Sequence, residues 1–322
     1  MTTRRDFLKT MTMASAGLAL GAGDILANPT FAAQRKITDK VKIAYVGIGN
    51  RGEQIIGDFA RTGMVEVVAL CDVDMGAPHT QKVMNLYPKA KRFRDFRQMF
   101  DKAGNEFDAV AIATPDHSHF PISMLALASG KHVYVEKPLA RTFYEGELLM
   151  QAALKRPNLV TQVGNQGHSE ANYFQFKAWM DAGIIKDVTA VTAHMNNPRR
   201  WHKWDTNIYK FPAGQQLPKD MEWDPWLGVT PYHEYNKDYH LGQWRCWYDF
   251  GMGCLGDWGA HILDTVHEFL ELGLPYEITL THQEGHNDYF FPYSSTILFR
   301  FPQRKGMPPV DITWYDGLDN LP

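Results

Sequence analysis

The stretch VKIAYVGIGNRGEQIIGDFA, residues 41–60, decides the fold. It begins with an apolar run typical of strands that are buried on both faces of a parallel sheet. The run ends in the pattern G-x-G-x-x-G, formed by Gly47, Gly49 and Gly52, and helical spacing follows it. A strand, a glycine turn and a helix in this order predict the first unit of a doubly wound α/β fold.

The same alternation continues to residue 163. Four further apolar runs are separated by segments of helical spacing, and the runs are VEVVALCD (65–72), FDAVAIAT (107–114), KHVYVE (131–136) and NLVTQVG (158–164). We therefore expect an N-terminal Rossmann domain with a parallel sheet over residues 40–163 and a second domain over residues 164–322. A formal charge of -3 and a hydrophobic content of 44% are those of an ordinary globular protein, and they imply no nucleic acid partner.

The glycine turn predicts a dinucleotide site. Glycine lets the backbone approach a pyrophosphate, and the free N–H groups at the helix start attract it. Asp72 ends the next run, 25 residues after Gly47, where a carboxylate can bind the adenosine ribose. Asp72 would repel a 2′-phosphate, so NAD is favoured over NADP. Arg51, which follows Asn50 in the turn, keeps NADP open.

The sequence T-P-D-H-S-H, residues 114–119, follows the third apolar run at the edge where such sheets bind ligands. We expect Pro115 to form a wall of the cofactor site, with further contacts from Thr114, Asp116 and His119. His117 and His119 also raise the possibility of a metal. Because no third ligand is near them, loop hydrogen bonds explain both histidines better, and we predict no metal site.

The fourth apolar run ends in Glu136, Lys137 and Pro138. Proline cannot continue a central strand, so the chain should leave the sheet at its carboxyl edge and place Lys137 near the nicotinamide. An amine there can bind a substrate hydroxyl or take part in proton transfer. Considered alone, a solvated surface lysine explains the residue better.

Three motifs, GIGNRG, TPDHSH and especially VEKPLA, together resemble the glucose-fructose oxidoreductase / inositol dehydrogenase / rhizopine catabolism (Gfo/Idh/MocA) family, over roughly residues 41–315. The resemblance implies an oxidoreductase that uses NAD(P) on CH–OH groups of carbohydrates and forms homo-oligomers. It also implies a C-terminal α/β domain with a large open, mostly antiparallel sheet, and cofactor contacts from Glu136, Lys137 and Gln166. Further strands should follow DITWYDGLDNLP (311–322), so we expect the chain to be incomplete.

The segment WYDFGMGCLGDWGAHILD, residues 247–264, is the candidate for the second domain's chemistry. Asp257 and His261 are four residues apart and would share a helix face, with Asp264 on the same side. A carboxylate beside an imidazole can orient it as a base. A merely structural histidine is the alternative, but four nearby glycines and the family pattern D-x-x-x-H-x-x-D favour catalysis by Lys137, Asp257 and His261. A zinc site of His261, His267 and Asp264 fits no usual spacing.

Seven of the nine tryptophans fall between residues 201 and 258. We expect at least half to pin a long loop to the surface beneath it. Trp201 or Trp204, near Arg199 and Arg200, could stack on a sugar ring. The three cysteines form no C-x-x-C pair and are too few for a disulfide framework.

The N-terminal segment MTTRRDFLKTM indicates export. Arg4 and Arg5 precede Phe7, Leu8 and a weakly apolar stretch that is too short and too polar to span a bilayer. We expect residues 1–33 to be a twin-arginine signal read by the export machinery, so the folded protein should be periplasmic or otherwise exported through this pathway.

Export constrains the chemistry, because no ready pool of free NAD exists outside the cytoplasm. A cofactor carried out must be held tightly and restored in place. We therefore expect an exported oxidoreductase that takes a hydride from a secondary alcohol of a sugar, cyclitol or glycoside. The alternatives are an NAD-dependent glycosidase or lyase that works by transient oxidation, elimination and re-reduction, and a nucleotide-binding module without turnover.

Overall fold

The computed structural model describes residues 40–196, 210–239 and 243–322. The chain forms two compact units. The first holds the chain up to Gly164 together with Gly214–Tyr235, and the second holds Asn165–Ala213 and Asn236–Pro322. The expected signal segment and the tryptophans Trp201 and Trp204 lie outside the described residues. Within the described parts of the chain, no helix is both long enough and apolar enough to cross a membrane.

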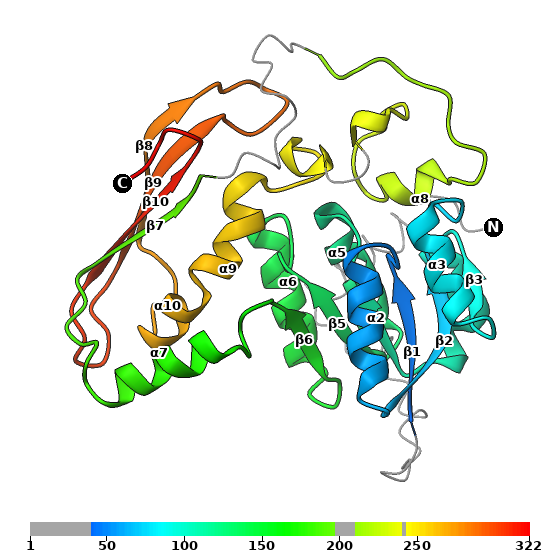
Figure 1. The fold of residues 1–322 in the computed structure, drawn as a ribbon, viewed down its shortest axis with the longest axis horizontal. Helices are drawn as coiled ribbons and strands as arrows, with labels where there is room; N and C mark the ends of the chain where they lie inside the picture. The colour runs from blue at the N-terminus through cyan, green and yellow to red at the C-terminus, as the bar shows by residue number, and fades with distance from the viewer. Residues whose placement is uncertain (1–39, 197–209, 240–242) are drawn as a thin grey trace. The chain divides into compact units, whose positions relative to one another are not determined.

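The first unit is built on a parallel sheet of six strands in the order β3-β2-β1-β4-β5-β6 (Figure 1). The strands are β1 (Val41–Val46), β2 (Val65–Cys71), β3 (Lys91–Phe93), β4 (Ala109–Ile112), β5 (His132–Glu136) and β6 (Thr161–Gly164). The order reverses between β1 and β4, and ligands bind at such a switch point in doubly wound folds. The predicted Rossmann sheet is confirmed.

Helices connect successive strands of this sheet. They are α2 (Arg51–Arg61), α3 (Pro78–Leu86), α4 (Phe96–Ala103), α5 (Asp116–Ala128) and α6 (Phe143–Leu154). Two helix starts show why the sequence folds in this way. Asp95 accepts a hydrogen bond from the Arg97 backbone N–H at the start of α4. Thr142 and Glu145 form a reciprocal capping box at the start of α6.

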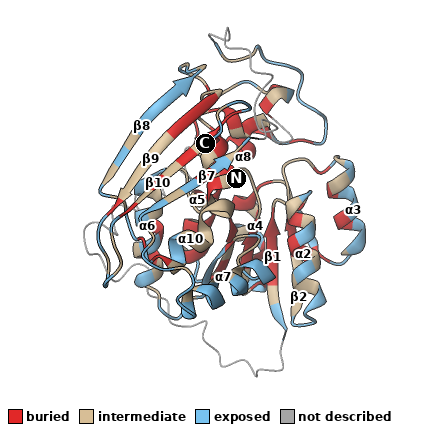
Figure 2. Cartoon of the chain, turned by 60° about the vertical axis from the view of Figure 1, so that its left-hand side comes forward, coloured by how far each residue is buried: buried red, intermediate tan, exposed pale blue. Residues whose placement is uncertain are grey.

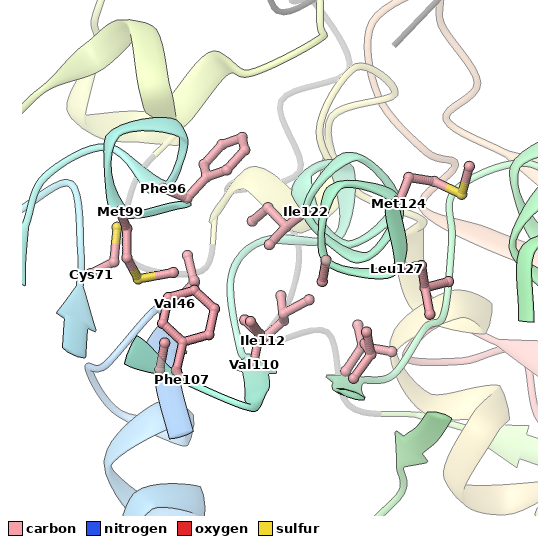
Figure 3. Close-up of a cluster of buried hydrophobic side chains, with 14 of the residues drawn as sticks. Val46, Cys71, Phe96, Met99, Phe107, Val110, Ile112, Ile122, Met124 and Leu127 are labelled. Carbon is pink, nitrogen blue, oxygen red and sulfur yellow. The ribbon is translucent and has the colours of Figure 1, made fainter. Parts of the chain in front are cut away.

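Alternate residues of the strands enter two separate cores, one on each face of the sheet. In β1, Ala44 and Val46 pack with the cluster that Figure 3 shows around Phe107 and Met99. Ile43 and Tyr45 pack with the opposite cluster. Because successive side chains of a strand point to opposite faces, only an unbroken apolar run can fill both cores.

Residues of the second half of the sequence return to the first unit. In Gly214–Tyr235, the Glu222 N–H donates to the Val73 carbonyl at 2.8 Å, and the Asp220 carbonyl accepts from the Met75 N–H at 3.2 Å. The segment therefore lies against the loop that follows β2. The sequence-based boundary at residue 163 placed this segment in the second domain.

An ion-pair cluster fastens the returning segment. The buried Arg97 guanidinium lies 2.8 Å from Asp95 and 2.7 Å from Asp224 in the short helix α8 (Trp223–Leu227). Asp224 is half exposed, whereas Asp95 is buried. Arg97 thus joins α4 to a helix that is more than a hundred residues away along the chain.

The second unit contains a mixed sheet of four strands in the order β7-β10-β9-β8. The strands are β7 (Ala190–Met195), β8 (Glu277–Glu284), β9 (Ser294–Phe301) and β10 (Val310–Asp316). β10 pairs with β7 in parallel, and the β10–β9 and β9–β8 pairs are antiparallel. The expected mostly antiparallel sheet is confirmed, and its edge strand β8 is largely exposed (Figure 2).

Short helices carry the catalytic candidates of the second unit. After α7 (Ala171–Asp181), a π-helical turn, Leu255–Gly259, leads into α9 (Ala260–Ile262) and α10 (Asp264–Phe269). Trp247 is fully buried and packs on Phe211, Tyr239 and Phe290. Trp247 is therefore structural, as expected for many of the tryptophans.

Candidate functional site

The turn after β1 has no room for a Cβ at its glycine positions. Gly47 has φ +77°, and a Cβ on it would lie 2.6 Å from the Ala113 carbonyl oxygen. A Cβ on Gly52 would lie 1.9 Å from the Gly47 carbonyl oxygen. Asn50, with φ 48°, caps α2. The turn thus brings bare backbone to the N-terminus of an 11-residue helix, which fits a bound pyrophosphate.

Asp72 lies directly beside this turn. Its carboxylate accepts hydrogen bonds from the Ile48 N–H at 2.9 Å and the Asp74 N–H at 3.0 Å. Burial raises the pKa of Asp72, although these two hydrogen bonds oppose the shift. Asp72, which directly follows β2, therefore lies beside the glycine turn, and its contact with the cofactor ribose stays a prediction.

His79, in the first turn of α3, is a further residue of this site that sequence reasoning missed. Its imidazole Cδ2 would lie 2.0 Å from a Cβ built on Gly49. The same ring acts electrostatically on Asp72 and lowers its pKa. His79 therefore borders both the glycine turn and the carboxylate. No spacing rule marks it, because its position depends on how the loop after β2 folds back.

Arg51 and Glu136, both predicted cofactor contacts, are bound to each other. The Arg51 guanidinium lies 3.0 Å from the buried Glu136 carboxylate, which also accepts a hydrogen bond from the Tyr134 hydroxyl at 3.2 Å. Burial raises the pKa of Tyr134 to about 12. A Cβ on Gly164 would lie 2.2 Å from the Tyr134 hydroxyl, so glycine makes room for this cluster.

The T-P-D-H-S-H segment forms the start of α5. His117 Nε2 lies 2.6 Å from the Trp226 carbonyl, and the two rings pack 4.8 Å apart. His119 places Nδ1 2.7 Å from the Pro138 carbonyl and Nε2 2.8 Å from the Thr114 carbonyl. His119 thus joins the two loops; direct contacts of Thr114, Pro115, Asp116 and His119 with the cofactor stay predictions.

Both histidines therefore bind backbone carbonyls, as expected of loop contacts. Among the residues that the structure describes, no group of three His, Cys, Asp or Glu side chains could hold a metal ion.

Lys137 stands at the carboxyl edge of the first unit's sheet. It directly follows β5, and its N–H donates to the Gly164 carbonyl at the end of β6, at 3.1 Å. The Lys137–Pro138 peptide bond is cis. The residue is half-buried.

Asp257 is buried in the π-helical turn of the second unit. Its carboxylate lies 3.6 Å from Arg245 Nε, and the Arg245 guanidinium packs 4.1 Å from the Trp244 ring centroid. A Cβ on Gly251 would lie 2.4 Å from Arg245 Cα. Glycine at 251 therefore allows the close backbone approach that the glycine-rich segment predicted, and this approach places Arg245 beside Asp257.

His261 is half-buried on α9, and its Nδ1 lies 3.3 Å from the Gln166 carbonyl oxygen. Its ring meets Trp258 edge to face at 5.8 Å. The regular helix expected to align Asp257 with His261 is interrupted between them, because Asp257 lies in the π-helical turn. Their shared catalytic role stays a prediction.

The remaining acid and histidine of this segment bind elsewhere. Asp264 lies 2.6 Å from His168 Nδ1, and His267 Nε2 lies 2.9 Å from the Gly273 carbonyl. The zinc arrangement of His261, His267 and Asp264, already disfavoured by its spacing, is thus absent from the described residues.

Both halves of the chain match models of one protein family. Residues 41–164 match a Gfo/Idh/MocA model described as "Oxidoreductase family, NAD-binding Rossmann fold". Residues 174–301 match a second model of that family, described as "Oxidoreductase family, C-terminal alpha/beta domain". The first match confirms the prediction of NAD as the cofactor, because the description of this domain names NAD.

Two curated relatives represent different activities. Inositol 2-dehydrogenase of Salmonella typhimurium is 30% identical over 147 residues, which is 45% of this chain and 43% of the relative. Glycosyl hydrolase family 109 protein 2 of Shewanella sp. (strain ANA-3) is 31% identical over 246 residues, 64% of this chain and 52% of the relative. The chain thus spans about half the length of these relatives.

A solved structure of low identity has the same fold. The WlbA dehydrogenase from Bordetella pertussis, in complex with NADH and UDP-GlcNAcA, matches with a TM-score of 0.60 at 18% identity. The match covers 85% of this chain and 70% of that one. It supports the fold, and no residue roles are transferred from it.

Proposed function

The chain belongs to the Gfo/Idh/MocA oxidoreductase family, and from this premise we propose that it takes a hydride from a secondary alcohol of a sugar, cyclitol or glycoside. The observation that carries the proposal is the bare glycine turn beside the Asp72 carboxylate, since this pair suits a dinucleotide. When bound, NAD supplies the hydride acceptor.

The chain's own residues suit NAD better than NADP. Asp72 faces the position of the adenosine ribose, where its negative charge would repel a 2′-phosphate. Arg51, the cation nearest the turn in sequence, is held at 3.0 Å by Glu136. Arg51 would have to leave this buried carboxylate before it could bind a 2′-phosphate, and that exchange would cost free energy.

Proton transfer is assigned to Lys137 and His261. Lys137 stands where the nicotinamide end of a dinucleotide lies in doubly wound folds, and its amine can bind the substrate hydroxyl. The His261 imidazole suits proton abstraction near neutral pH. The buried Asp257 carboxylate, beside Arg245, completes the proposed acid–base set.

A second function is favoured by the relative from Shewanella, whose name assigns it to a glycosidase family. In this alternative, the sugar gives a hydride to the cofactor and loses its aglycone by elimination. The ketone is then reduced by the returned hydride, after water has added to the double bond in a glycosidase and without that addition in a lyase. Such a cycle needs no external oxidant. The cycle would suit a protein that is exported with its cofactor, as the twin-arginine segment predicts. Export and the formation of homo-oligomers both stay part of the proposal.

Mass spectrometry and a panel of glycosides test the proposal. Mass spectrometry of the purified chain should find NAD. A panel of glycosides then separates the two activities, because keto-sugar formation with NADH supports a dehydrogenase, whereas aglycone release without added cofactor supports a glycosidase. Bound nucleotide with neither product would indicate a binding module.

Lys137→Ala tests the assigned acid–base role. It should lower turnover by about 10²-fold or more, as is usual when a general acid–base group is lost, and leave NAD affinity within a few-fold of the original. Unchanged turnover would remove Lys137 from the mechanism.

A further inference from the structure

Three successive contacts tie the loop after β6 to the helices that carry His261. Asn165 Nδ2 donates to the Ala260 carbonyl at 2.8 Å. The Gln166 carbonyl lies 3.3 Å from His261 Nδ1. His168 Nδ1 lies 2.6 Å from the Asp264 carboxylate. The loop therefore runs alongside α9 and α10, and each contact lies further along both segments.

The middle contact determines which nitrogen of His261 carries the proton. A carbonyl oxygen only accepts hydrogen bonds, so Nδ1 must be the N–H donor to Gln166. In the neutral ring, Nε2 then holds the lone pair. A base needs such a lone pair to take a hydroxyl proton, and the loop backbone selects Nε2 for that role.

We infer that His168 and Asp264 are positioning residues, which hold the loop so that the Gln166 carbonyl keeps His261 in its Nδ1–H form. This inference rests on the proposed role of His261 as a base. The sequence-based expectation that the Asp257 carboxylate orients the imidazole stays a prediction beside it.

Several groups of α7 and α10 surround the His168 ring and hold it in place. Asp264 and Glu268 of α10 face its two nitrogens, at 2.6 Å and 3.7 Å. Tyr173 of α7 packs against the ring at 4.7 Å and donates its hydroxyl to Glu268 at 2.8 Å. His168, Asp264 and Glu268 are all partly exposed. Partly exposed ion pairs contribute little to global stability, so the main effect of the cluster should be on loop geometry.

Nitrogen-15 NMR of the histidine rings in the full chain tests the inference without turnover. The His261 signals are assigned as those lost in His261→Asn. We expect wild-type His261 to show the Nδ1–H form at a pH at which the ring is neutral. In His168→Ala, its signals should move towards an average of the two tautomers. The Nε2–H form in the wild type would overturn the inference.

Kinetics supply the second measurement. With a substrate found in the glycoside panel, His168→Ala should lower kcat by about 10- to 100-fold, as is usual for groups that orient a functional histidine, while KM and NAD affinity change less than about twofold. Asp264→Asn keeps an oxygen acceptor and should retain most of the turnover. Asp264→Ala removes the acceptor of the same contact and is the second test variant if His168→Ala folds poorly.

His267→Ala is the matched control. It removes a histidine from the same helix whose partner is the Gly273 carbonyl, and it should change neither the tautomer nor kcat. Equal effects of His267→Ala and His168→Ala would refute a specific positioning role, as would an unchanged tautomer in both His168→Ala and Asp264→Ala. If the wild type turns over no carbohydrate, the proposed function fails, but the NMR result still decides whether the loop sets the tautomer.

Discussion

Replacing Gly52 by Ala should disrupt the nucleotide site through one added methyl group. Gly52 lies in the first turn of α2, and its Cβ would be 1.9 Å from the Gly47 carbonyl oxygen. The backbone fixes the position of the Cβ, and the oxygen it meets belongs to the backbone, so no side-chain rotation can relieve the clash. Either the glycine turn or the start of α2 must move.

The expected cost is about 1–3 kcal/mol, as is typical of an added group in a tightly packed region. The melting temperature should fall by about 2–4 °C for each kcal/mol lost in a unit of this size. NAD affinity should also fall, because the shifted turn no longer aligns its N–H groups with the pyrophosphate. A loss of 1–3 kcal/mol in binding would be about 5- to 150-fold.

Gly57→Ala is the matched control on the same helix. A Cβ at Gly57 would meet only Arg61 Nη1, at 3.6 Å, which is ordinary van der Waals contact. Because alanine favours a helix over glycine by about 0.5–1 kcal/mol, this variant should be stabilised. Thermal denaturation and calorimetric NAD titration of both variants test the argument. If Gly52→Ala matches Gly57→Ala in stability and affinity, the close contact does not constrain the turn.

Three further predictions concern buried charges. Asp72→Ala should weaken NAD binding by about 10- to 100-fold, since hydrogen bonds to a charged group contribute about 1.5–3 kcal/mol. It should also narrow the preference of the protein for NAD over NADP. An unchanged ratio of the NAD and NADP affinities would contradict the assignment of Asp72 to the ribose. Arg97→Ala should cost about 3–5 kcal/mol in urea denaturation, because it leaves the buried Asp95 carboxylate without this partner, whereas Asp224→Ala should cost less than about 1 kcal/mol; equal losses would refute the argument from burial. Burial raises the pKa of Asp316 in the folded state above its unfolded pKa of about 3.9. Between these two pKa values the folded state binds more protons than the unfolded state. The free energy of unfolding therefore falls as pH rises through that window. Asp316→Asn should flatten this part of the stability profile, and parallel profiles of variant and wild type would show that Asp316 does not titrate there.

The Rossmann unit could be predicted from the sequence because its signals are local. The unbroken apolar runs report burial on both faces, and β1 divides Ala44 and Val46 from Ile43 and Tyr45 between two cores. The turn needs glycine for steric reasons, which leaves a readable spacing. Asp72 follows from the same logic, since it ends the next strand.

The features that the sequence did not reveal depend on contacts between distant segments. The return of Gly214–Tyr235 to the first unit depends on backbone hydrogen bonds to Val73 and Met75. Backbone groups are the same in every residue type, so these bonds leave no signal in the sequence. The π-helical turn at Leu255–Gly259 changes which residues share a face, although the residue spacing is that of a regular helix. His79 reaches Asp72 only because the chain folds back after β2.

Two buried carboxylates, Asp72 and Asp316, show that a raised pKa alone does not identify a predicted binding residue. Burial raises the pKa of both Asp72 and Asp316. Asp316 accepts hydrogen bonds from the Ser295 N–H, the Ser295 hydroxyl and the Trp314 indole, all within the β9–β10 pair. Asp72 accepts from two backbone N–H groups, those of Ile48 in the glycine turn and Asp74 in the loop after β2. The surroundings of the two carboxylates therefore differ, and a pKa shift alone would not have distinguished these two acids.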